Sequence, residues 1–182
     1  MTRPLIFRSD GSPLAVADPI GCGGEGIVYA VANDNKVAVK IYTGGGAERR
    51  DKIVAMVAAR LFERTPLAAF PIEIVRNKGG DFAGFVMRRI SGHKPLFQLY
   101  APGERKANFP AATYSFLVQS ALNFAKAVGA VHATGCIIGD INHSGVLIAD
   151  NALVVDGEPC DSTEIACHDR IEIGDPRCAS AL

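Results

Sequence analysis

The segment that decides the fold is GCGGEGIV, residues 21–28. It matches the spacing G-x-G-x-x-G-x-V and lies between short apolar, β-branched runs at Leu14–Ile20 and Ile27–Ala32, which predict strands. Glycines let a backbone turn tightly and bring its N–H groups close to phosphate oxygens. Taken alone, the segment is better explained by a glycine-rich hairpin without a ligand. A strand after the glycines, rather than a helix, argues against a dinucleotide-binding fold.

A lysine on the next predicted strand makes the phosphate interpretation more specific. The strand expected over Lys36–Tyr42 contains Val37-Ala38-Val39-Lys40 and places Lys40 14 residues beyond Gly26. A strand lysine is ordinarily solvated at its tip. Beside a glycine loop, however, its ammonium is expected to face bound phosphates. The two motifs together therefore indicate nucleotide binding more strongly than either motif alone.

The rest of the first half predicts one helix and two more strands. A helix is expected over Ala47–Phe62, because its apolar residues recur at helical spacing, and Thr65-Pro66 ends it. Strands are expected over Pro71–Arg76 and Phe82–Arg89. These elements predict an antiparallel five-stranded lobe with one helix over residues 1–90.

The second half predicts a shortened, mostly helical lobe over residues 91–182, so the fold class is α+β. After a polar connection at 91–110, a helix is expected from about Ala111 to His132, ended by Gly135. Its apolar stripe consists of Leu117, Ala121, Phe124, Val128 and Val131. Val146–Ala149 and Ala152–Val155 then predict a hairpin.

Two aspartates flank that predicted hairpin. Asp140 lies before it, in the segment that follows the long helix, and Asp156 comes directly after it. A lone loop aspartate usually caps a turn. Behind a glycine loop and a strand lysine, however, this order is how a kinase places its base and its metal ligand.

This order of motifs resembles the protein-kinase superfamily, and more narrowly the bacterial kinase-like domains often fused to helix-hairpin-helix segments. The resemblance covers roughly residues 14–158 and implies a two-lobe, protein-kinase-like fold that uses ATP and Mg²⁺. It implies that Lys40 contacts the α and β phosphates, that Asp140 is the base and that Asp156 holds Mg²⁺. The hinge would be Arg88–Ile90. The other implied nucleotide-binding residues are Gly21, Gly23, Gly26 and Val28 at the loop, Met87 at the back of the adenine pocket, and Arg89 and Ile90 of the hinge.

The chain departs from the kinase pattern around Asp140. Ile138-Gly139 replace the histidine and arginine before the catalytic aspartate, and Gly145 replaces the asparagine that binds a second metal ion. Asn142 is near enough to substitute in part, as a catalytic residue and metal ligand. The D-F-G position reads Asp156-Gly157-Glu158.

The acid that pairs with Lys40 is a separate question. Glu48, Asp51 and Glu63 all lie in the predicted helix 47–62 or just after it. Asp51 fits the pattern best, and a solvated helix face is the alternative for all three. Asp51 therefore joins the predicted nucleotide-binding residues.

Composition excludes several other classes of protein. The 182 residues contain 19 basic and 19 acidic side chains, which argues against a chain whose main task is to coat nucleic acid or anionic lipid. No apolar run reaches the roughly 18 residues of a membrane span. Five scattered cysteines favour free thiols in a reducing cytoplasm.

The last 27 residues differ from the rest, with seven acidic and two basic side chains. No activation segment is recognisable there, so we expect a truncated or degenerate kinase domain, or a tail that packs in an unfamiliar way. The function predicted is ATP-dependent phosphoryl transfer to Ser or Thr of an unidentified protein substrate, with no membrane or nucleic-acid partner. The alternative is a pseudokinase or nucleotide-binding regulatory module. A small-molecule phosphotransferase of related fold fits the motifs less well.

Overall fold

The structure is a computed structural model, and it describes residues 3–44, 47–138, 141, 145–149, 163–165 and 171–173. The chain divides into two compact units. The first comprises residues 1–64 and 69–89, and the second comprises residues 65–68 and 90–182.

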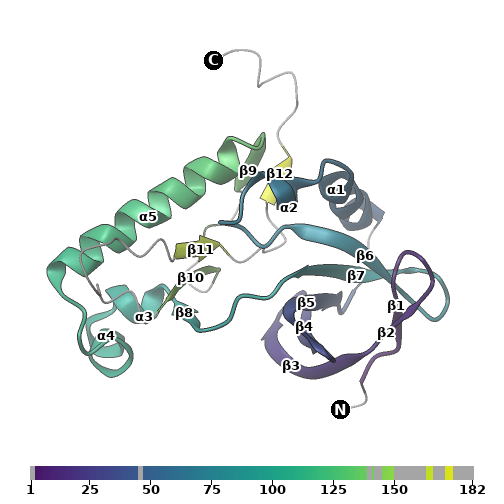
Figure 1. The fold of residues 1–182 in the computed structure, drawn as a ribbon, viewed down its shortest axis with the longest axis horizontal. Coiled ribbons are helices and arrows are strands. Elements are labelled where there is room, and N and C mark those ends of the chain that lie inside the picture. The colour runs from purple at the N-terminus through teal and green to yellow at the C-terminus, as the bar shows by residue number, and fades with distance from the viewer. Residues whose placement is uncertain are drawn as a thin grey trace. The chain divides into compact units, whose positions relative to one another are not determined.

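The first unit is built on one antiparallel sheet of seven strands, which curls in Figure 1. The strand order is β2-β1-β6-β7-β5-β4-β3. The strands are β1 (Ile6–Phe7), β2 (Pro13–Leu14), β3 (Val16–Gly23), β4 (Gly26–Val31), β5 (Asp34–Tyr42), β6 (Pro71–Asn77) and β7 (Phe82–Arg88). Five of them, β3 to β7, correspond to the strands expected from the sequence.

The sheet is wider than expected because β1 and β2 extend it beyond β6. β1 pairs with both β2 and β6, through the register Ile6↔Leu14 and Ile6↔Asn77. Each of these strands is only two residues long. Two residues are too few to show the alternation of apolar and polar side chains by which a strand is recognised in a sequence. Their buried side chains nevertheless belong to the core of the first unit.

The core of the first unit lies on one face of the sheet. It consists of Ile6, Leu14, Val16, Tyr29, Val31, Val39, Val75 and Val86, and Val39 and Val75 have no exposed surface. Burial of these side chains supplies the main driving force for curling the sheet. The opposite face of β5 carries Ala38, Lys40 and Tyr42, because successive side chains of a strand point to opposite faces.

The helix predicted over Ala47–Phe62 is two helices, α1 (Ala47–Ala58) and α2 (Leu61–Arg64). The prediction of one continuous helix was wrong because Arg60 adopts a left-handed conformation, with φ of 51°. Non-glycine residues take this conformation at a cost, and here it changes the chain direction between the helices. Ile53, Met56 and Leu61, three of the predicted apolar positions, are buried.

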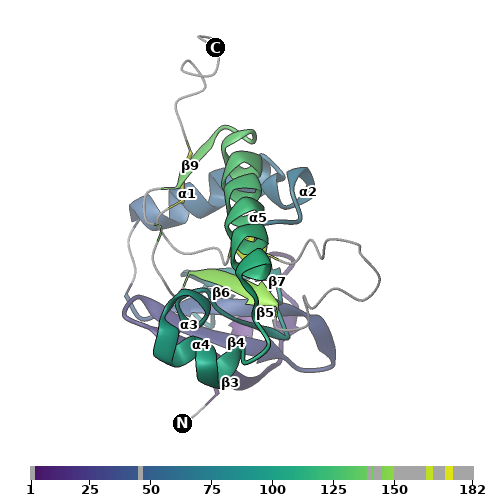
Figure 2. The ribbon, with the colours of Figure 1, turned by 90° about the vertical axis from the view of Figure 1, so that its left-hand side faces the viewer.

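The second unit is organised around α5 (Tyr114–His132), the long helix of Figure 2. Thr113 caps its N-terminus, where the side-chain oxygen accepts a hydrogen bond of 3.2 Å from the Phe116 N–H. Gly135, with φ of 84°, follows its end as the sequence predicts. The other elements are β8 (His93–Pro95), α3 (Phe97–Tyr100), α4 (Pro102–Asn108), β9 (Cys136–Ile138), β10 (Val146–Ala149), β11 (Thr163–Ile165) and β12 (Ile171–Ile173).

Three features of the second unit differ from the sequence-based expectation or extend it. The connection at 91–110 contains β8, α3 and α4. β10 pairs with β8 and β11, whereas the expected second arm of its hairpin, 152–155, lies outside the described residues. The buried face of α5 consists of Ser120, Asn123, Ala127 and Val131, so it is rotated by about one residue from the predicted stripe, and Ala121 is exposed.

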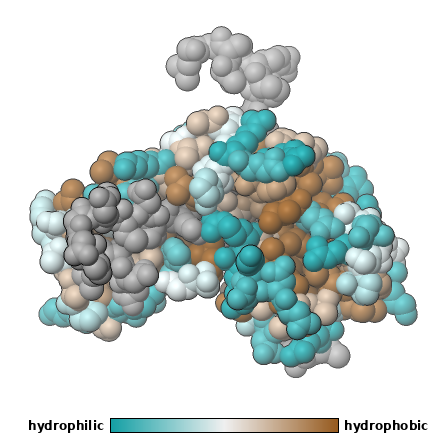
Figure 3. All heavy atoms as spheres, viewed as in Figure 1, coloured by the Kyte–Doolittle hydropathy of each residue, from teal (hydrophilic) through white to brown (hydrophobic). Residues whose placement is uncertain are grey.

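Hydrophilic and hydrophobic residues are interspersed on the visible surface in Figure 3. Among the described residues, no helix combines the length and the hydropathy that a membrane span requires.

A substitution of Gly84 on β7 would test how tightly the strands of the first unit are packed. A Cβ at this position would lie 1.9 Å from the Lys40 carbonyl oxygen on β5, so Gly84→Ala must push two paired strands apart. We expect it to lower the free energy of unfolding by about 2 kcal/mol or more, within or above the usual range for overpacking.

The matched control is Gly129→Ala on α5, where an added Cβ meets nothing within 4 Å. Alanine has the better helix propensity, so we expect an unchanged or higher free energy of unfolding, by up to about 1 kcal/mol. Urea denaturation measures both variants. Equal stability of Gly84→Ala and wild type would contradict the close packing.

Candidate functional site

The glycine loop is the hairpin that joins β3 and β4. Gly21 pairs with Val28 and Gly23 pairs with Gly26, so Gly24 and Glu25 form the turn. The loop therefore has the strand–turn–strand form that the sequence predicts.

The glycines of this hairpin stand in different surroundings. A Cβ on Gly26 would lie 2.4 Å from the Ile41 carbonyl oxygen, whereas a Cβ on Gly23 or Gly24 meets nothing within 4 Å. Gly21 is intermediate, at 3.8 Å from the Val28 Cβ. The packing of β4 against β5 thus requires glycine at position 26. At positions 23 and 24 it leaves the backbone open to an approaching ligand.

Lys40 lies in the middle of the sheet, in line with the glycine loop. It pairs with Val28 on β4 and with Phe85 on β7, and Val28 pairs with Gly21. Residues directly opposite one another in antiparallel strands share a face, so Gly21, Val28 and Lys40 lie on one face of the sheet. The structure thereby brings the two sequence motifs together.

Lys40 is unusually well buried for a lysine, with 6% of its surface exposed. Its ammonium nitrogen lies 5.3 Å from the centroid of the Tyr42 ring, within the range of a cation–π contact. Tyr42 also contacts Phe82 and Phe85, at ring-centroid distances of 5.8 and 6.1 Å. Removing a lysine ammonium from water is costly, so its burial at this place is a specific feature of the first unit.

The predicted adenine-side residues continue the same face away from the loop. Met87 pairs with Ala38 of β5 and is half-buried. The Arg89 N–H donates to the Lys36 carbonyl oxygen at 2.8 Å, and Arg89 also lines an open hollow beside residues 30–36. Ile90 begins the second unit. Within the first unit, Val28, Lys40, Met87 and Arg89 are therefore on one surface.

The three candidate acids differ in their surroundings. The exposed Asp51 carboxylate accepts a hydrogen bond of 2.9 Å from Arg50 Nε, and Glu48 is also exposed. Glu63 accepts from the Arg60 guanidinium, and this hydrogen bond lowers the pKa of Glu63 and raises that of Arg60. Asp51 as the partner of Lys40 stays a prediction.

Two residues beside Lys40 were not predicted from the sequence. Tyr42 lies two positions further along β5 and so points to the same face, a signal that strand alternation alone provides. Arg49, in the first turn of α1, stacks on the Tyr42 ring with its guanidinium carbon 4.6 Å from the ring centroid. The local sequence around Arg49 carries no signal for this contact.

Three predicted site residues of the second unit, Asp140, Asn142 and Asp156, lie outside the described residues. The segment that carries Asp140 and Asn142 connects β9 to β10. Gly145 directly precedes β10 and is buried.

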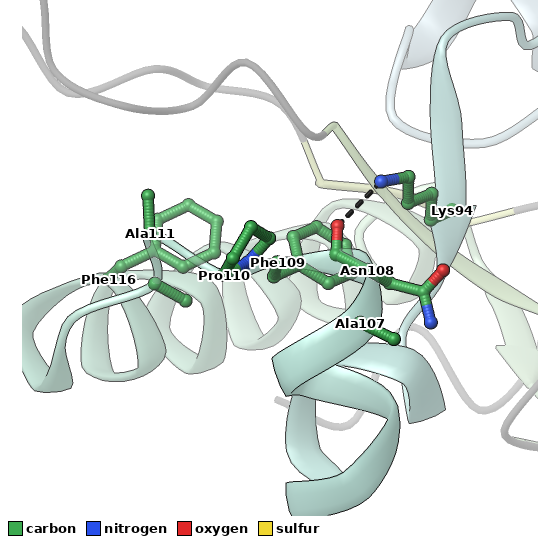
Figure 4. Close-up of a pocket in the computed structure, with 8 residues that line it drawn as sticks. Lys94, Ala107, Asn108, Phe109, Pro110, Ala111 and Phe116 are labelled. Carbon is green, nitrogen blue, oxygen red and sulfur yellow. Dashed lines mark hydrogen bonds between the residues drawn. The ribbon is translucent and has the colours of Figure 1, made fainter.

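A hollow of about 380 Å³ lies between α4 and the start of α5 in the second unit (Figure 4). Lys94 stands at its edge, donates to the Asn108 carbonyl oxygen at 2.6 Å and lies 5.0 Å from the Phe109 ring centroid. Its ammonium is thus already engaged by the protein, and the hollow contains none of the predicted site residues.

Comparison with known proteins supports the kinase resemblance. No protein-family profile matches the chain. It is 30% identical over 156 residues to protein kinase YegI of Escherichia coli (strain K12), and 29% identical over 155 residues to the protein of that name from Escherichia coli O157:H7. These matches cover 85% and 84% of the chain, but the chain spans only about a quarter of the length of each relative.

The ROP18 kinase domain, solved in complex with AMP-PNP and sucrose, has the same fold. The TM-score is 0.58 at 15% identity, over 96% of this chain and 59% of that chain. The predicted fold class is therefore confirmed, and the similarities in sequence and in fold bear out the resemblance to the protein-kinase superfamily. The narrower resemblance to domains fused to helix-hairpin-helix segments stays a prediction.

Gly26 and Gly23 should respond differently to the same substitution. Gly26→Ala places a methyl group against the Ile41 carbonyl, so we expect a loss of about 2 kcal/mol or more in the free energy of unfolding. Gly23→Ala has open space, and we expect a change within about 0.5 kcal/mol. Urea denaturation of both variants tests this, and equal effects would contradict the assignment of a packing role to Gly26 alone.

Proposed function

We propose that this chain binds ATP on the Lys40 face of its seven-stranded sheet and transfers a phosphoryl group to Ser or Thr of a protein substrate. The observation that carries the proposal is the register Gly21↔Val28↔Lys40. It aligns a buried ammonium with a hairpin whose Gly23 and Gly24 leave the backbone uncovered. The AMP-PNP in complex with the ROP18 kinase domain supports a nucleotide as the ligand of this fold.

Two features of the described residues suit a nucleoside triphosphate, namely the open glycine turn and the Lys40 ammonium. Backbone N–H groups of an open glycine turn are donors for phosphate oxygens, and the absence of side chains at these glycines lets a phosphate approach. Lys40 would hold the α and β phosphates, while Val28 and Met87 would offer apolar contacts to the adenine. Arg89 and Ile90 would complete the hinge.

Phosphoryl transfer in kinases depends mainly on positioning and on neutralising charge. Asp140 would orient the acceptor hydroxyl and accept its proton. Asp156, with Asn142, would hold Mg²⁺, which supplies charge neutralisation between the phosphates. Asp51 would pair with Lys40 and orient it.

The five cysteines favour a cytoplasmic protein.

A second candidate function is a pseudokinase, which binds nucleotide without significant turnover. Gly145 favours it, because a glycine directly before β10 provides no side chain for a second metal ion. Both candidates require nucleotide binding at Lys40 and differ only in phosphoryl transfer.

Lys40→Met tests nucleotide binding. Methionine keeps an unbranched apolar stem but removes the charge, so we expect a folded variant whose ATP affinity falls about tenfold or more, the scale of a lost charge-assisted hydrogen bond. Lys36→Met is the matched control, because Lys36 is on the same strand and face but is exposed. Isothermal titration calorimetry with ATP and Mg²⁺ measures both. Unchanged affinity in Lys40→Met would remove Lys40 from the site.

Asp140→Asn distinguishes the two candidate functions. We expect ATP affinity within a few-fold of wild type and a loss of phosphoryl transfer of roughly two orders of magnitude or more, the scale of general-base effects. Transfer of ³²P from labelled ATP to a mixed protein substrate measures turnover. A wild-type chain that binds ATP but transfers no phosphate would favour the pseudokinase.

A further inference from the structure

Arg49 connects the first turn of α1 to the tip of the glycine loop. Among the residues that the structure describes, its guanidinium makes three contacts, all within the first unit. Nη2 lies 3.4 Å from Glu25 Oε1, Nη1 donates to the Gly44 carbonyl oxygen at 3.1 Å, and the guanidinium carbon lies 4.6 Å from the Tyr42 ring centroid. The Tyr42 ring and the Gly44 carbonyl hold the guanidinium in place. The ion pair with Glu25 connects the guanidinium to the glycine loop.

Glu25 occupies a place where a negative charge is unfavourable for the proposed ligand. It forms the turn of the glycine hairpin together with Gly24, and its backbone oxygen accepts a hydrogen bond of 3.0 Å from the Thr43 N–H. Its carboxylate is therefore carried by the same turn as the open backbone of Gly24. A phosphate at that backbone would be repelled by an uncompensated carboxylate.

The ion pair between Arg49 and Glu25 is better explained by charge than by stability. The Arg49 side chain is 30% exposed and that of Glu25 is 43% exposed. Ion pairs at this degree of exposure contribute little to folding. Glu25 is the one acidic residue of the segment 21–28, and it directly follows Gly24. The ion pair with Arg49 nevertheless neutralises the charge of Glu25.

We propose that Arg49 is a positioning residue for nucleotide binding, which neutralises and holds Glu25 so that the glycine loop accepts phosphates. The inference rests on the proposed nucleotide site. Tyr42 connects Arg49 to Lys40, because its ring contacts both the Lys40 ammonium and the Arg49 guanidinium. The Tyr42 ring thus contacts two cations. In this proposal, Lys40 faces the phosphates directly, whereas Arg49 acts on the phosphates through Glu25.

The experiment is a double-mutant cycle on the full 182-residue chain, read out as dissociation constants for Mg·ATP and for adenosine by calorimetry. We expect Arg49→Met to weaken ATP binding by about three- to tenfold, the effect of one uncompensated, partly screened carboxylate. Adenosine binding should change less than about twofold, because adenosine carries no phosphate. Glu25→Gln alone should keep or tighten ATP binding.

The double variant Glu25→Gln, Arg49→Met carries the decisive result. It has the same net charge as wild type and no carboxylate at the loop, so we expect ATP affinity to return to within about twofold of wild type. A residue with a merely structural role would not be rescued by removing its partner. Arg49→Lys, which keeps the charge, should also bind ATP as wild type does.

Arg50→Met is the matched control, because Arg50 is the neighbouring residue of α1 and is paired with Asp51 instead. It removes the same charge from the same helix and should leave ATP affinity unchanged. An equal loss in Arg50→Met, an equal loss for adenosine, or a double variant as weak as Arg49→Met would each overturn the inference.

Failure of the inference is separable from failure of the proposed function. If wild type binds ATP and Arg49→Met binds it equally well, the role of Arg49 is wrong and the nucleotide site stands. If wild type does not bind ATP, both are wrong. Should Arg49→Met fail to fold, Glu25→Gln and Arg49→Lys still test the role of the charge, and loss of ATP binding in either would contradict it.

Discussion

Two consecutive carbonyl groups of β5, those of Lys40 and Ile41, each lie against a glycine of a neighbouring strand. Gly84 of β7 contacts the first and Gly26 of β4 contacts the second, at distances that leave no room for a Cβ. β5 is therefore held between its neighbours at Lys40, the residue whose ammonium we assign to nucleotide binding. Because backbone position determines side-chain direction on a strand, this packing directs Lys40 to the face opposite the apolar core.

The same packing determines the electrostatics around the loop. Gly26 anchors one arm of the hairpin to β5, so the turn at Gly24 and Glu25 stays near the end of β5 and the start of α1. Tyr42 and Arg49 are then within reach of the turn. Lys40 and Arg49, two cations near the loop, are thus both placed against the ring of Tyr42.

Sequence patterns predicted the part of the fold that the site depends on. The strands β3 to β7, the glycine hairpin and the position of Lys40 follow from alternation and from glycine spacing, both of which act locally. β1 and β2 were missed because a strand of two residues is too short to show a period-2 alternation of hydropathy. The break between α1 and α2 was missed because Arg60 has no sequence signal for a left-handed conformation.

The rotation of α5 has a different cause. Its buried face includes Ser120 and Asn123, which a hydropathy pattern assigns to the surface. Ser120 Oγ donates to the Phe116 carbonyl oxygen at 2.7 Å, and the Asn123 side-chain oxygen accepts from Gln119 Nε2 at 2.8 Å. Polar groups satisfied within their own helix can be buried at little cost. The contacts of Arg49 were equally hidden, since they join residues that no local pattern relates.

The unequal surroundings of the glycines have an evolutionary consequence. Selection for folding acts on Gly26 and Gly84 whether or not a ligand binds, because any side chain at either position collides with a backbone carbonyl. Under the proposed function, Gly23 and Gly24 would be kept by ligand binding alone, since a side chain at either position would project into open space. A lineage that abandons the nucleotide while keeping the sheet would therefore accumulate substitutions at positions 23 and 24 and retain glycine at 26 and 84. The order in which these four glycines are lost among descendants would record whether binding or folding was relaxed first.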